Sequence, residues 1–411
     1  MVLDPYSAGL ALARRMIRRG ARVTVFVEPQ EPFVARSRRV ESVVVPFEQD
    51  GERWLRAIQQ IASSSDTAVA LPATDRASAL LTRAEDRLPP NVLRFERSDS
   101  AHTELMDKAR ADSLARRAGV LVPWTARVLS REDLWRLAPT APWPCVVKPV
   151  LSHEWRRRFG EARAFLAEDG ECAERLLQRP LNAGLEMLLC QYIPGGDEDV
   201  EEAIVVRLAD GSYPVRFGCR KLRQCPPSFG VTALGESSEL PETMALAERV
   251  LDEADFVGVA GVEAKRHRDT GERWFVDANV RLPAQWGLGD ACGAQATPRL
   301  IAALCGQKLG ARPRLRAGVG FVQPDLDWQV LWPTVKAASS RRRPALAWDL
   351  MRPYLGAREL GLLDLRDPGP LLAFLGAAMR RRTAGLATHV GMTGRHEPID
   401  GDRNSRRGLH R

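Results

Sequence analysis

The sequence predicts an α/β unit followed by an α+β unit, and three observations support this prediction. The chain has 411 residues, which is too long for one ordinary hydrophobic core and indicates two to three domains. Residues 1–100 alternate helical and strand patterns, which is typical of a parallel sheet flanked by helices. Residues 101–310 place neighbouring strand patterns before a long helical one, which is typical of an antiparallel sheet with helices.

The elements expected in the first unit follow from apolar periodicity and from the glycine positions. A helix is expected over residues 9–19, because the pattern stops at Gly20 and glycine commonly closes a helix. Helices are also expected over 54–62 and 77–85, and strands over 22–27, 42–46 and 68–72. A first strand should precede the loop at 5–9, so either the chain begins late or that strand is stunted.

The second unit is expected to begin with a helix over residues 107–118. A short buried strand at 145–149 contains Lys148, and a second apolar run is seen at 187–193. Further elements are expected in this order: strands at 203–208 and 215–222, a helix at 241–255 and a hairpin at 261–281. From about 311 the chain is helical in patches, and residues 391–411 are expected to form a disordered basic tail.

Composition excludes several classes of protein. Seven scattered cysteines without a CxxC pair form neither a disulfide framework nor a zinc site, and they fit a reducing compartment. No apolar run approaches the ~20 residues of a membrane span. Residues 1–5 lack the basic start and apolar core of a secretory signal. The sequence therefore predicts a cytoplasmic protein without a membrane span.

The net charge of +8 lies in the last fifth of the chain. Residues 331–411 contain 15 Lys and Arg against 7 Asp and Glu, whereas residues 1–330 contain 45 of each class. The basic clusters, such as residues 341–343, are not interleaved with aromatic residues, which argues against nucleic acid as a partner. A solvated basic surface is the favoured interpretation.

One predicted hairpin has the residue types of a magnesium–nucleotide site. Its turn is centred on Thr270, so Glu263 and Asp277, each seven residues away, are expected to lie opposite each other. Asp277, Asn279 and Arg281 share one face of the second strand because side chains alternate along a strand. Oxygen ligands hold a hard cation, and a guanidinium group meets an anionic oxygen.

An isolated hairpin of this kind is also typical of a solvent-facing surface with cross-strand ion pairs. The lysines bear on this choice, because only six of the 60 basic residues are Lys. Lys108 opens a helix, Lys148 ends a buried strand, and Lys221 lies in a basic strand, all of them before the hairpin. A lysine at such a place can meet a phosphate as a point charge, although Lys148 alone is also typical of a strand-end lysine that reaches solvent.

Five segments together resemble the ATP-grasp enzymes, and more closely their carboxylate–amine ligase branch. The segments follow the order of that family over about residues 100–300: 106–108 (MDK), 145–149 (CVVKP), 190–195 (CQYIPG), 218–227 (GCRKLRQCPP) and the hairpin at 263–281. Thr74-Asp75, Ser37-Arg38 and Asp367-Pro368-Gly369-Pro370 are also similar to that branch.

The resemblance implies a domain organisation. Residues 1–100 would form a Rossmann-like pre-ATP-grasp domain, and residues 101–310 a two-lobed ATP-grasp domain. The small lobe would comprise residues 101–185 and the large lobe residues 186–310. A helical C-terminal extension would follow at 311–390.

The resemblance also implies roles for individual residues, and the first group surrounds the nucleotide. Its members are Lys108, Lys148, Gln191, Tyr192, Ile193 and Asp197. The two lysines would neutralise the phosphates, residues 191–193 would form the hinge under the adenine, and the aspartate or a near neighbour would lie by the ribose.

A second group would hold the metal and the reacting groups. Glu263, Asp277 and Asn279 would bind one or two Mg²⁺ ions. The cations expected at the reacting groups are Arg281, Arg220, Lys221 and Arg223. The first two would stabilise the transferring phosphoryl group or the acyl phosphate, and the other two would meet the substrate carboxylate. This chain departs from the family in having Asp277 where glutamate is usual and Val280 where proline is usual.

The expected activity is therefore that of an ATP-dependent ligase which joins a carboxylate to an amine through an acyl phosphate. Its cofactors would be ATP and Mg²⁺, or Mn²⁺ in its place, and its partners small-molecule carboxylates and amines. An ATP-grasp carboxylase is a second interpretation, although the chain has no biotin-linked region. A sensor or subunit that has lost catalysis is a third, and retention of both carboxylates argues against it. The oligomeric state stays open, a homo-oligomer included.

Overall fold

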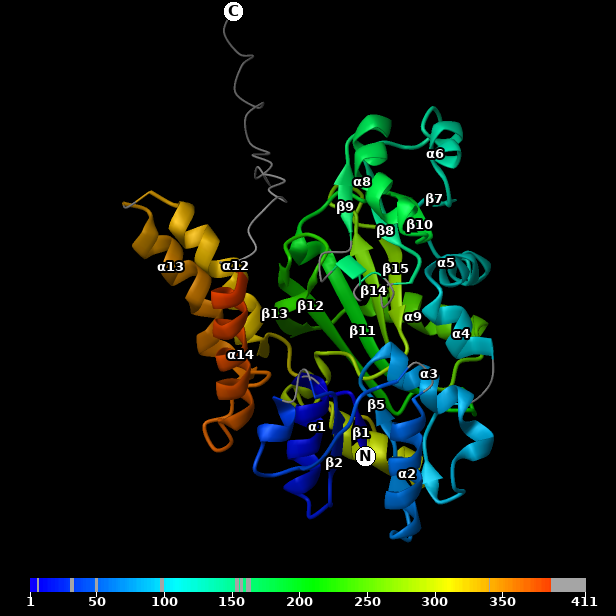
Figure 1. The fold of residues 1–411 in the computed structure, drawn as a ribbon, viewed down its shortest axis with the longest axis vertical. Helices are drawn as coiled ribbons and strands as arrows, with labels where there is room; N and C mark the ends of the chain where they lie inside the picture. The colour runs from blue at the N-terminus through cyan, green and yellow to red at the C-terminus, as the bar shows by residue number, and fades with distance from the viewer. Residues whose placement is uncertain are drawn as a thin grey trace, which may run out of the picture.

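The computed structural model describes residues 1–5, 7–29, 33–48, 51–96, 100–151, 155, 158–159, 164–339 and 341–385. In Figure 1 a parallel sheet near the N-terminus lies at one end and a small antiparallel sheet at the other. A larger sheet lies between them, and the C-terminal helices form a lobe on one flank. The tail at 391–411, predicted to be disordered, lies outside the described residues.

The N-terminal sheet is parallel, as predicted, with the strand order β3-β2-β1-β5. Its strands are β1 (Val2–Leu3), β2 (Thr24–Val27), β3 (Glu41–Val44) and β5 (Leu71–Pro72). The short first strand therefore forms, and it lies inside the sheet between β2 and β5.

The single strand predicted at 68–72 is wrong, because the chain changes its partner there. The N–H of Ala70 still donates to the carbonyl of Leu93, whereas that of Leu71 donates to Met1. The residues before this change form β4 (Ala68–Val69), which pairs with β6 (Val92–Leu93).

Helices cover both faces of the N-terminal sheet. They are α1 (Ser7–Ile17), α2 (Glu52–Ser63) and α3 (Asp75–Arg83), with short 3₁₀ turns η1 (Val34–Arg36) and η2 (Glu85–Arg87). Leu10 of α1 packs in one core with Val25, while Trp54 of α2 packs against Phe26 in another, with the two rings tilted. Helix α3 begins two residues earlier than predicted because the Thr74 side chain caps it by accepting the N–H of Ala77.

The small antiparallel sheet has the order β7-β10-β8-β9. Its strands are β7 (Thr125–Val128), β8 (Cys145–Pro149), β9 (Phe165–Ala167) and β10 (Met187–Gln191). Helices α6 (Arg131–Leu137) and α8 (Gly170–Asn182) pack against it around a core that includes Leu134, Val147 and Leu177. Helices α4 (Ser100–Met106) and α5 (Lys108–Arg117) precede the sheet, and Asp107 caps α5 through the N–H groups of residues 109 and 110.

The large sheet has the order β15-β14-β11-β12-β13-β16-β17 and is antiparallel except for its last pair. Its long strands are β11 (Val200–Arg207), β12 (Val215–Cys225), β13 (Val231–Ser238), β14 (Gly258–Arg266) and β15 (Arg273–Asn279). The 3₁₀ turn η3 (Asp197–Asp199) precedes β11. Helix α9 (Pro241–Glu253) covers one face, and α10 (Trp286–Ala291) and α11 (Ala296–Leu304) pack on the other.

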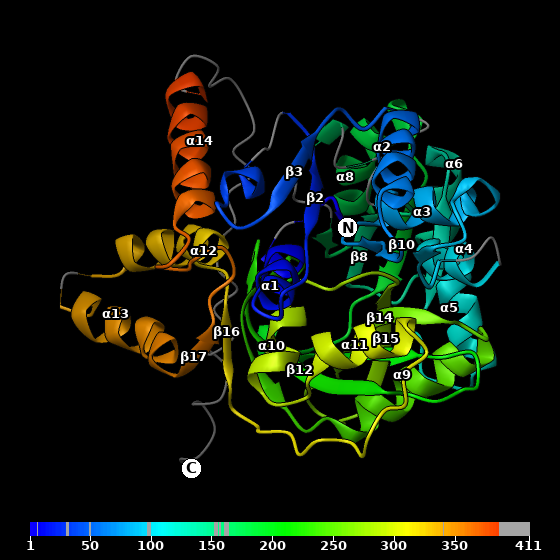
Figure 2. The same cartoon turned by 90° about the horizontal axis from the view of Figure 1, so that it is seen from below.

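The C-terminal part is not only helical, as the sequence had suggested. It contributes β16 (Gly320–Val322) and β17 (Ala357–Glu359) to the edge of the large sheet. Its helices are α12 (Pro324–Ala337), α13 (Arg343–Met351) and α14 (Gly369–Gly385), with the 3₁₀ turn η4 (Arg352–Gly356). Figure 2 shows these helices standing beside the rest of the molecule. None of the described helices is long and apolar enough to cross a bilayer.

A buried aspartate joins the C-terminal part to the N-terminal unit. Asp367 accepts a hydrogen bond from Ser37 Oγ at 2.7 Å and from Arg14 Nη2 at 3.0 Å. Ser37 and Asp367 both belong to segments that the sequence singled out, and here they meet across 330 residues.

Candidate functional site

The β14–β15 hairpin forms with the predicted register. Glu263 pairs directly with Asp277, and a bulge follows Glu263. Gly271 in the turn has φ +75°, a left-handed conformation that glycine adopts without a steric cost. Strand alternation and turn chemistry therefore place the two carboxylates side by side, as the sequence predicted.

Two lysines from other parts of the chain pair with these carboxylates. Lys221 Nζ of β12 lies 2.9 Å from Glu263 Oε2, and the Lys221 side chain is almost fully buried. Lys108 at the start of α5 forms an ion pair with Asp277. Burial alone would lower the pKa of Lys221, but the charges of Glu263 and Glu202 outweigh it and raise that pKa above its ordinary value. The hairpin is thus part of a buried charge cluster and not a free solvent-facing surface.

Glu202 of β11 is a member of this cluster that the sequence analysis missed. It is paired with Glu263 across the β11–β14 ladder and is only 1% exposed. Burial, and then the negative charge of Glu263, raise the pKa of Glu202 to about 8. A Cβ at Gly261 would lie 2.3 Å from Glu202 Oε1, so glycine at 261 leaves the space for this carboxyl group. Its Oε2 has no hydrogen-bond partner among the described residues.

Lys148 faces the same region from the small sheet. Burial alone would lower the pKa of Lys148, but Cys190, Asp112 and Asp277 raise it above its ordinary value. Asp112 of α5 is buried, and burial raises the pKa of its carboxyl group. Lys148 and Lys108 therefore both lie near Asp277, which brings the small sheet, α5 and the hairpin to one place.

Arg281 joins the hairpin to the N-terminal unit. Its Nε lies 2.9 Å from Asp75 Oδ1, and its Nη2 donates to Asn279 Oδ1 at 3.1 Å. Burial would raise the pKa of Asp75, but the Arg281 charge and hydrogen bond hold it below its ordinary value. Asp75 belongs to the Thr74-Asp75 segment of the resemblance, and this ion pair is what that segment contributes to the cluster.

The hinge residues lie at the end of β10. The N–H of Gln191 donates to the Trp124 carbonyl at 2.7 Å, and the N–H of Tyr192 donates to the Pro144 carbonyl at 3.1 Å. Ile193 is buried. The segment is held by its own backbone and presents an apolar side chain, and its contact with an adenine stays a prediction.

Asp197 anchors a loop in this structure. Its Oδ2 accepts the backbone N–H of Gln224 at 2.8 Å, and its Oδ1 accepts Gln224 Nε2 and the N–H of Ser228, both at 2.9 Å. These bonds fix the turn between β12 and β13. The neighbouring Glu198 is the exposed carboxylate of this run.

Arg220 and Arg223 do not join the cluster, although the sequence placed them with Lys221. Side chains alternate along β12, so Arg220 points to the face opposite Lys221, where it pairs with Glu236 at 2.5 Å. Arg223 binds both carboxylate oxygens of Asp327 at 2.7 Å, and Asp327 is fully buried in α12. The spacing of basic residues alone does not reveal these acidic partners from other strands and helices.

The donor set fits a magnesium ion that arrives with a nucleotide. Glu263, Asp277 and Asn279 provide the oxygen donors that Mg²⁺ prefers. In the part of the chain that the structure describes, no three Asp, Glu, His or Cys side chains converge as a complete metal cage. Mg²⁺ is commonly held by one or two carboxylates, with phosphates and waters as the other ligands, so such a cage is not needed. The unpartnered Glu202 Oε2 adds a buried oxygen beside Glu263.

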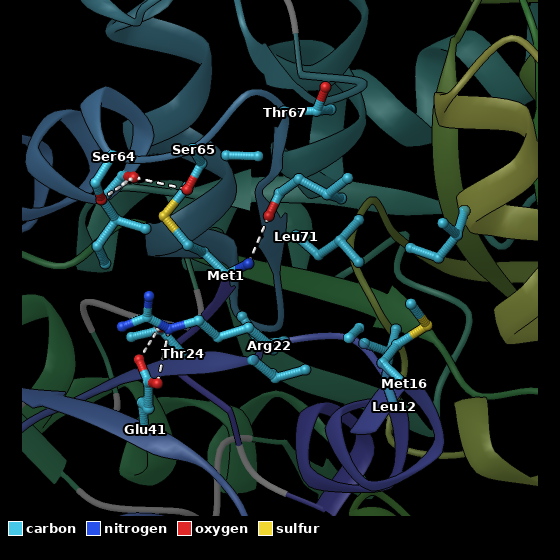
Figure 3. Close-up of a pocket in the computed structure, with 17 residues that line it drawn as sticks. Met1, Leu12, Met16, Arg22, Thr24, Glu41, Ser64, Ser65, Thr67 and Leu71 are labelled. Atoms are coloured by element: carbon cyan, nitrogen blue, oxygen red, sulfur yellow. Dashed lines mark hydrogen bonds and ion pairs between the residues drawn. The ribbon is translucent and has the colours of Figure 1, made fainter. Parts of the chain in front are cut away.

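A cavity of about 330 Å³ lies elsewhere, in the N-terminal unit (Figure 3). Leu12 and Met16 line it together with the first residues of the parallel strands, such as Thr24, and with the Arg22–Glu41 ion pair. Ligands of open parallel sheets bind outside the carboxyl ends of the strands, whereas this cavity is at the amino ends. None of the predicted site residues lines it, so it is separate from the candidate site.

With this geometry, the molecule has the fold of the ATP-grasp enzymes, as the resemblance predicted. It is similar to an N5-carboxyaminoimidazole ribonucleotide synthetase solved with ADP, at a TM-score of 0.63 and 17% identity over 82% of this chain and 84% of that one. It is also similar to the biotin carboxylase domain of 2-oxoglutarate carboxylase from Hydrogenobacter thermophilus, at a TM-score of 0.61 and 15% identity over 78% and 72% of the two chains.

A third similar structure is N5-carboxyaminoimidazole synthase from Aspergillus clavatus in complex with ADP and 5-aminoimidazole ribonucleotide. Its TM-score is 0.56 at 14% identity, over 75% of this chain and 77% of that one. No family model and no curated protein match the sequence. At these identities the likeness establishes the fold.

Proposed function

We propose that this chain is an ATP-dependent ligase that joins a carboxylate to an amine through an acyl phosphate and releases ADP and phosphate. The observation that carries the proposal is the meeting of Glu263 and Asp277 with Lys221 and Lys108. Two acids and two lysines come together from α5, β12 and the β14–β15 hairpin. The ATP-grasp fold supports the same conclusion, because similar structures were solved with ADP.

In this proposal Lys108 and Lys148 neutralise the nucleotide phosphates. A lysine ammonium group is a compact charge that meets phosphate oxygens without a fixed geometry. When Lys108 turns to a phosphate, it leaves the carboxylate of Asp277, which it contacts in this structure. Gln191, Tyr192 and Ile193 hold the adenine, and Asp197 or the exposed Glu198 lies by the ribose.

Glu263, Asp277 and Asn279 would hold Mg²⁺, with Mn²⁺ able to replace it. When bound there, the ion would neutralise phosphate charge and orient the γ-phosphate for transfer. The lysine pairs are consistent with this role, because the partly buried carboxylates of Glu263 and Asp277 already each contact a cation where the metal would bind.

The reaction then proceeds in two balanced steps. An oxygen of the substrate carboxylate attacks the γ-phosphorus, and the bond to the β-phosphate oxygen breaks, which yields an acyl phosphate and ADP. The amine nitrogen next attacks the acyl carbon, phosphate leaves with the electron pair of its C–O bond, and the amine proton passes to solvent. These two steps need no nucleophile from the chain, so its contribution is positioning and charge stabilisation.

Four cations were predicted to lie at the reacting groups. Arg281 and Lys221 retain this role in the proposed mechanism. Both belong to the charge cluster, and Arg281 is oriented by Asp75 and Asn279. Arg220 and Arg223 would reach a substrate only after leaving Glu236 and Asp327.

The division into domains at 1–100, 101–310 and 311–390, with lobes at 101–185 and 186–310, stays a prediction. The parallel, small antiparallel and large sheets follow one another along the chain in the predicted order. The lobe boundary at 185/186 is wrong for the sheets, however, because β10 at 187–191 pairs with β7 and β8 in the small sheet. In the proposal, the small sheet and the large sheet are the two lobes that enclose the nucleotide.

A second candidate is a carboxylase that activates bicarbonate and transfers it to an amine. One similar structure, the biotin carboxylase domain of 2-oxoglutarate carboxylase, was solved with MgADP, ADP and bicarbonate. Bicarbonate carries an anionic O–C=O group, as a carboxylate does, so the same charge cluster would serve.

The test is a screen for ADP release from Mg·ATP by the purified full chain. Pools of amino acids, small acids and bicarbonate are combined with pools of amines, and the Glu263→Gln variant is assayed beside the wild type. The proposal predicts stimulation that needs one acid and one amine and is lost in the variant. Binding of ATP without stimulation by any pool would support the sensor interpretation instead.

A further inference from the structure

The C-terminal extension exposes an unusual number of large apolar side chains. Among the described residues, 13 large hydrophobic side chains are exposed, and eight of them lie between residues 328 and 375. Trp348 is 60% exposed, Leu355 75% and Leu372 63%. Single exposed hydrophobic residues are ordinary, but such a concentration marks a surface that meets another apolar phase.

Helix α12 has a buried inner side and an outer side that carries exposed tryptophans. Leu331 on its inner side is buried, and Asp327 binds Arg223 of β12. On its outer side Trp328 and Trp332 stack with their ring centroids 5.4 Å apart, and both are about half exposed. Among the described residues, this aromatic pair therefore stays open to solvent on the outer side of α12.

Basic residues surround these apolar side chains. Arg341, Arg342 and Arg343 lie between α12 and α13 or at the start of α13 and are all exposed, as are Lys336 and Arg352. Asp349 is the exposed acid of α13. Figures 1 and 2 show α12 and α13 together at the outer side of the C-terminal lobe. We call the exposed residues Trp328, Trp332, Trp348, Met351 and Leu355, with Arg341–Arg343, the docking face.

The positive charge of the docking face indicates which kind of partner can bind there. In a symmetric contact with a second copy, the same arginines would be brought together from both sides, and like charges in one interface repel. Nucleic acid would match the arginines, but its phosphates offer nothing to Met351 and Leu355. A membrane surface with anionic lipids matches both, because arginine meets the headgroups while tryptophan and aliphatic side chains enter the interface.

We propose that the docking face binds the surface of a membrane that contains anionic lipids. The contact is peripheral: tryptophan and leucine side chains of α12, α13 and η4 insert at the headgroup level, and the arginine cluster neutralises lipid charge. The Arg223–Asp327 ion pair joins α12 to β12, so the membrane-bound lobe stays attached to the sheet that carries Lys221.

The test is flotation of the purified full chain with vesicles of phosphatidylcholine alone and with about a third phosphatidylglycerol. The proposal predicts binding to the anionic vesicles only, and its loss at about 0.5 M salt, where charges more than about 4 Å apart are screened. Charge reversal by Arg341→Glu with Arg342→Glu is expected to weaken binding about tenfold or more. Arg19→Glu with Arg56→Glu changes the net charge equally, at exposed positions outside the docking face, and is expected to leave binding unchanged.

The apolar part is tested separately with Trp348→Ser combined with Leu355→Ser. Trp135→Ser is the control, because Trp135 is exposed to a similar degree as Trp348, at 54%, but lies on α6. Both apolar variants should keep the far-UV circular dichroism of the wild type, and only the first should lose binding. Equal binding to neutral and anionic vesicles would overturn the proposal, and so would wild-type binding by the Trp348→Ser/Leu355→Ser double variant. Binding to DNA in place of vesicles would also overturn it, as would a concentration-dependent dimer that the same variants abolish.

Discussion

Lys221 Nζ lies 2.9 Å from Glu263 Oε2, although β12 and β14 are not neighbours and β11 runs between them. The strand between them contributes Glu202, whose carboxyl group is buried beside the same pair. Three strands thus place one lysine and two acids on one face of the large sheet. Removing these acids from water costs free energy, and the charge of Lys221 offsets part of that cost.

Replacement of Lys221 should therefore lower the stability of the folded chain. Lys221→Met leaves Glu263 and Glu202 without their shared cation, so the free energy of unfolding in metal-free buffer should fall by about 3–5 kcal/mol. Added Mg²⁺ should restore stability to the variant more than to the wild type, because the carboxylates then have no competing cation. Urea unfolding measures both effects, with the exposed Lys308→Met as control. Equal losses in the two variants would contradict the account.

The second lysine of the proposed phosphate site gives a prediction on activity. Lys148→Ala should lower ADP release at least about a hundredfold, because a partly buried cation that would face the transferred phosphate charge is lost. Nucleotide affinity should fall as well, while the circular dichroism spectrum should not change. Lys308→Ala, at an exposed position, should behave as the wild type. Near-wild-type turnover of the Lys148 variant would remove this residue from the site.

The ion pair between Asp75 and Arg281 couples the N-terminal unit to the hairpin. In Asp75→Asn the guanidinium group loses its charged partner at 2.9 Å and becomes less well oriented. We expect ADP release to fall about tenfold or more with little change in nucleotide affinity, since a misplaced group affects transfer more than binding. Asp86→Asn, exposed in the same unit, is the control. An equal loss of nucleotide affinity and of rate would argue against this role.

Because the pKa of Glu202 is raised, we expect the stability of the protein to depend on pH when neither metal nor nucleotide is added. Its pKa is about 8 in the folded chain, against an ordinary value of 4.5. Between these values the folded state holds a proton that the unfolded state has released, so the stability contributed by this group falls as pH rises from about 5 to 8. Glu202→Gln cannot ionise, and it should be more stable than the wild type by roughly 2–4 kcal/mol at about pH 8.5.

At about pH 5 the same Glu202→Gln substitution should have little effect, because Glu202 is then protonated in the folded state. The comparison is made by urea unfolding at both pH values, with the exposed Glu272→Gln of the same hairpin as control. A stability difference that does not change with pH would show that Glu202 is charged in the folded protein.

The Arg223–Asp327 ion pair should stabilise the folded chain. Asp327 is fully buried, accepts hydrogen bonds from Nε and Nη2 of Arg223, both at 2.7 Å, and also accepts one from the Tyr354 hydroxyl. Asp327→Asn leaves a largely buried arginine without its counter-charge, which should lower the free energy of unfolding by about 3 kcal/mol. Asp349→Asn, exposed on α13, should change it by less than about 0.5 kcal/mol. Similar unfolding curves for the two variants would contradict the interpretation of this contact.

The hairpin could be predicted because the turn and strand signals that define it lie close together in the sequence. Strand alternation and a glycine turn bring Glu263 and Asp277 to the same level of the hairpin. Their direct pairing also needs the bulge after Glu263, because the pairs nearer the turn are centred between residues 269 and 270 and not on Thr270. The strand at 145–149 was likewise predicted with the bounds that the structure gives.

The partners of the cluster were less predictable because they depend on tertiary contacts. Glu202 lies in an apolar strand directly after another acid, and only the order of strands in the sheet reveals that it faces Glu263. Arg223 was assigned to a substrate because nothing in the sequence connects it with Asp327, which is 104 residues away. The split of residues 68–72 into two strands has the same origin, since it depends on a change of neighbouring strand.

The most direct test of the central claim compares Glu263→Gln with Glu272→Gln, two isosteric changes in the same hairpin. ADP release from Mg·ATP is measured in the presence of the acid and amine that stimulate the wild type. The account predicts that Glu263→Gln lowers the rate at least about a hundredfold while Glu272→Gln leaves it unchanged, because only the first residue can hold the metal with its charge. Equal rates in both variants would contradict the assignment of this hairpin as the magnesium–nucleotide site.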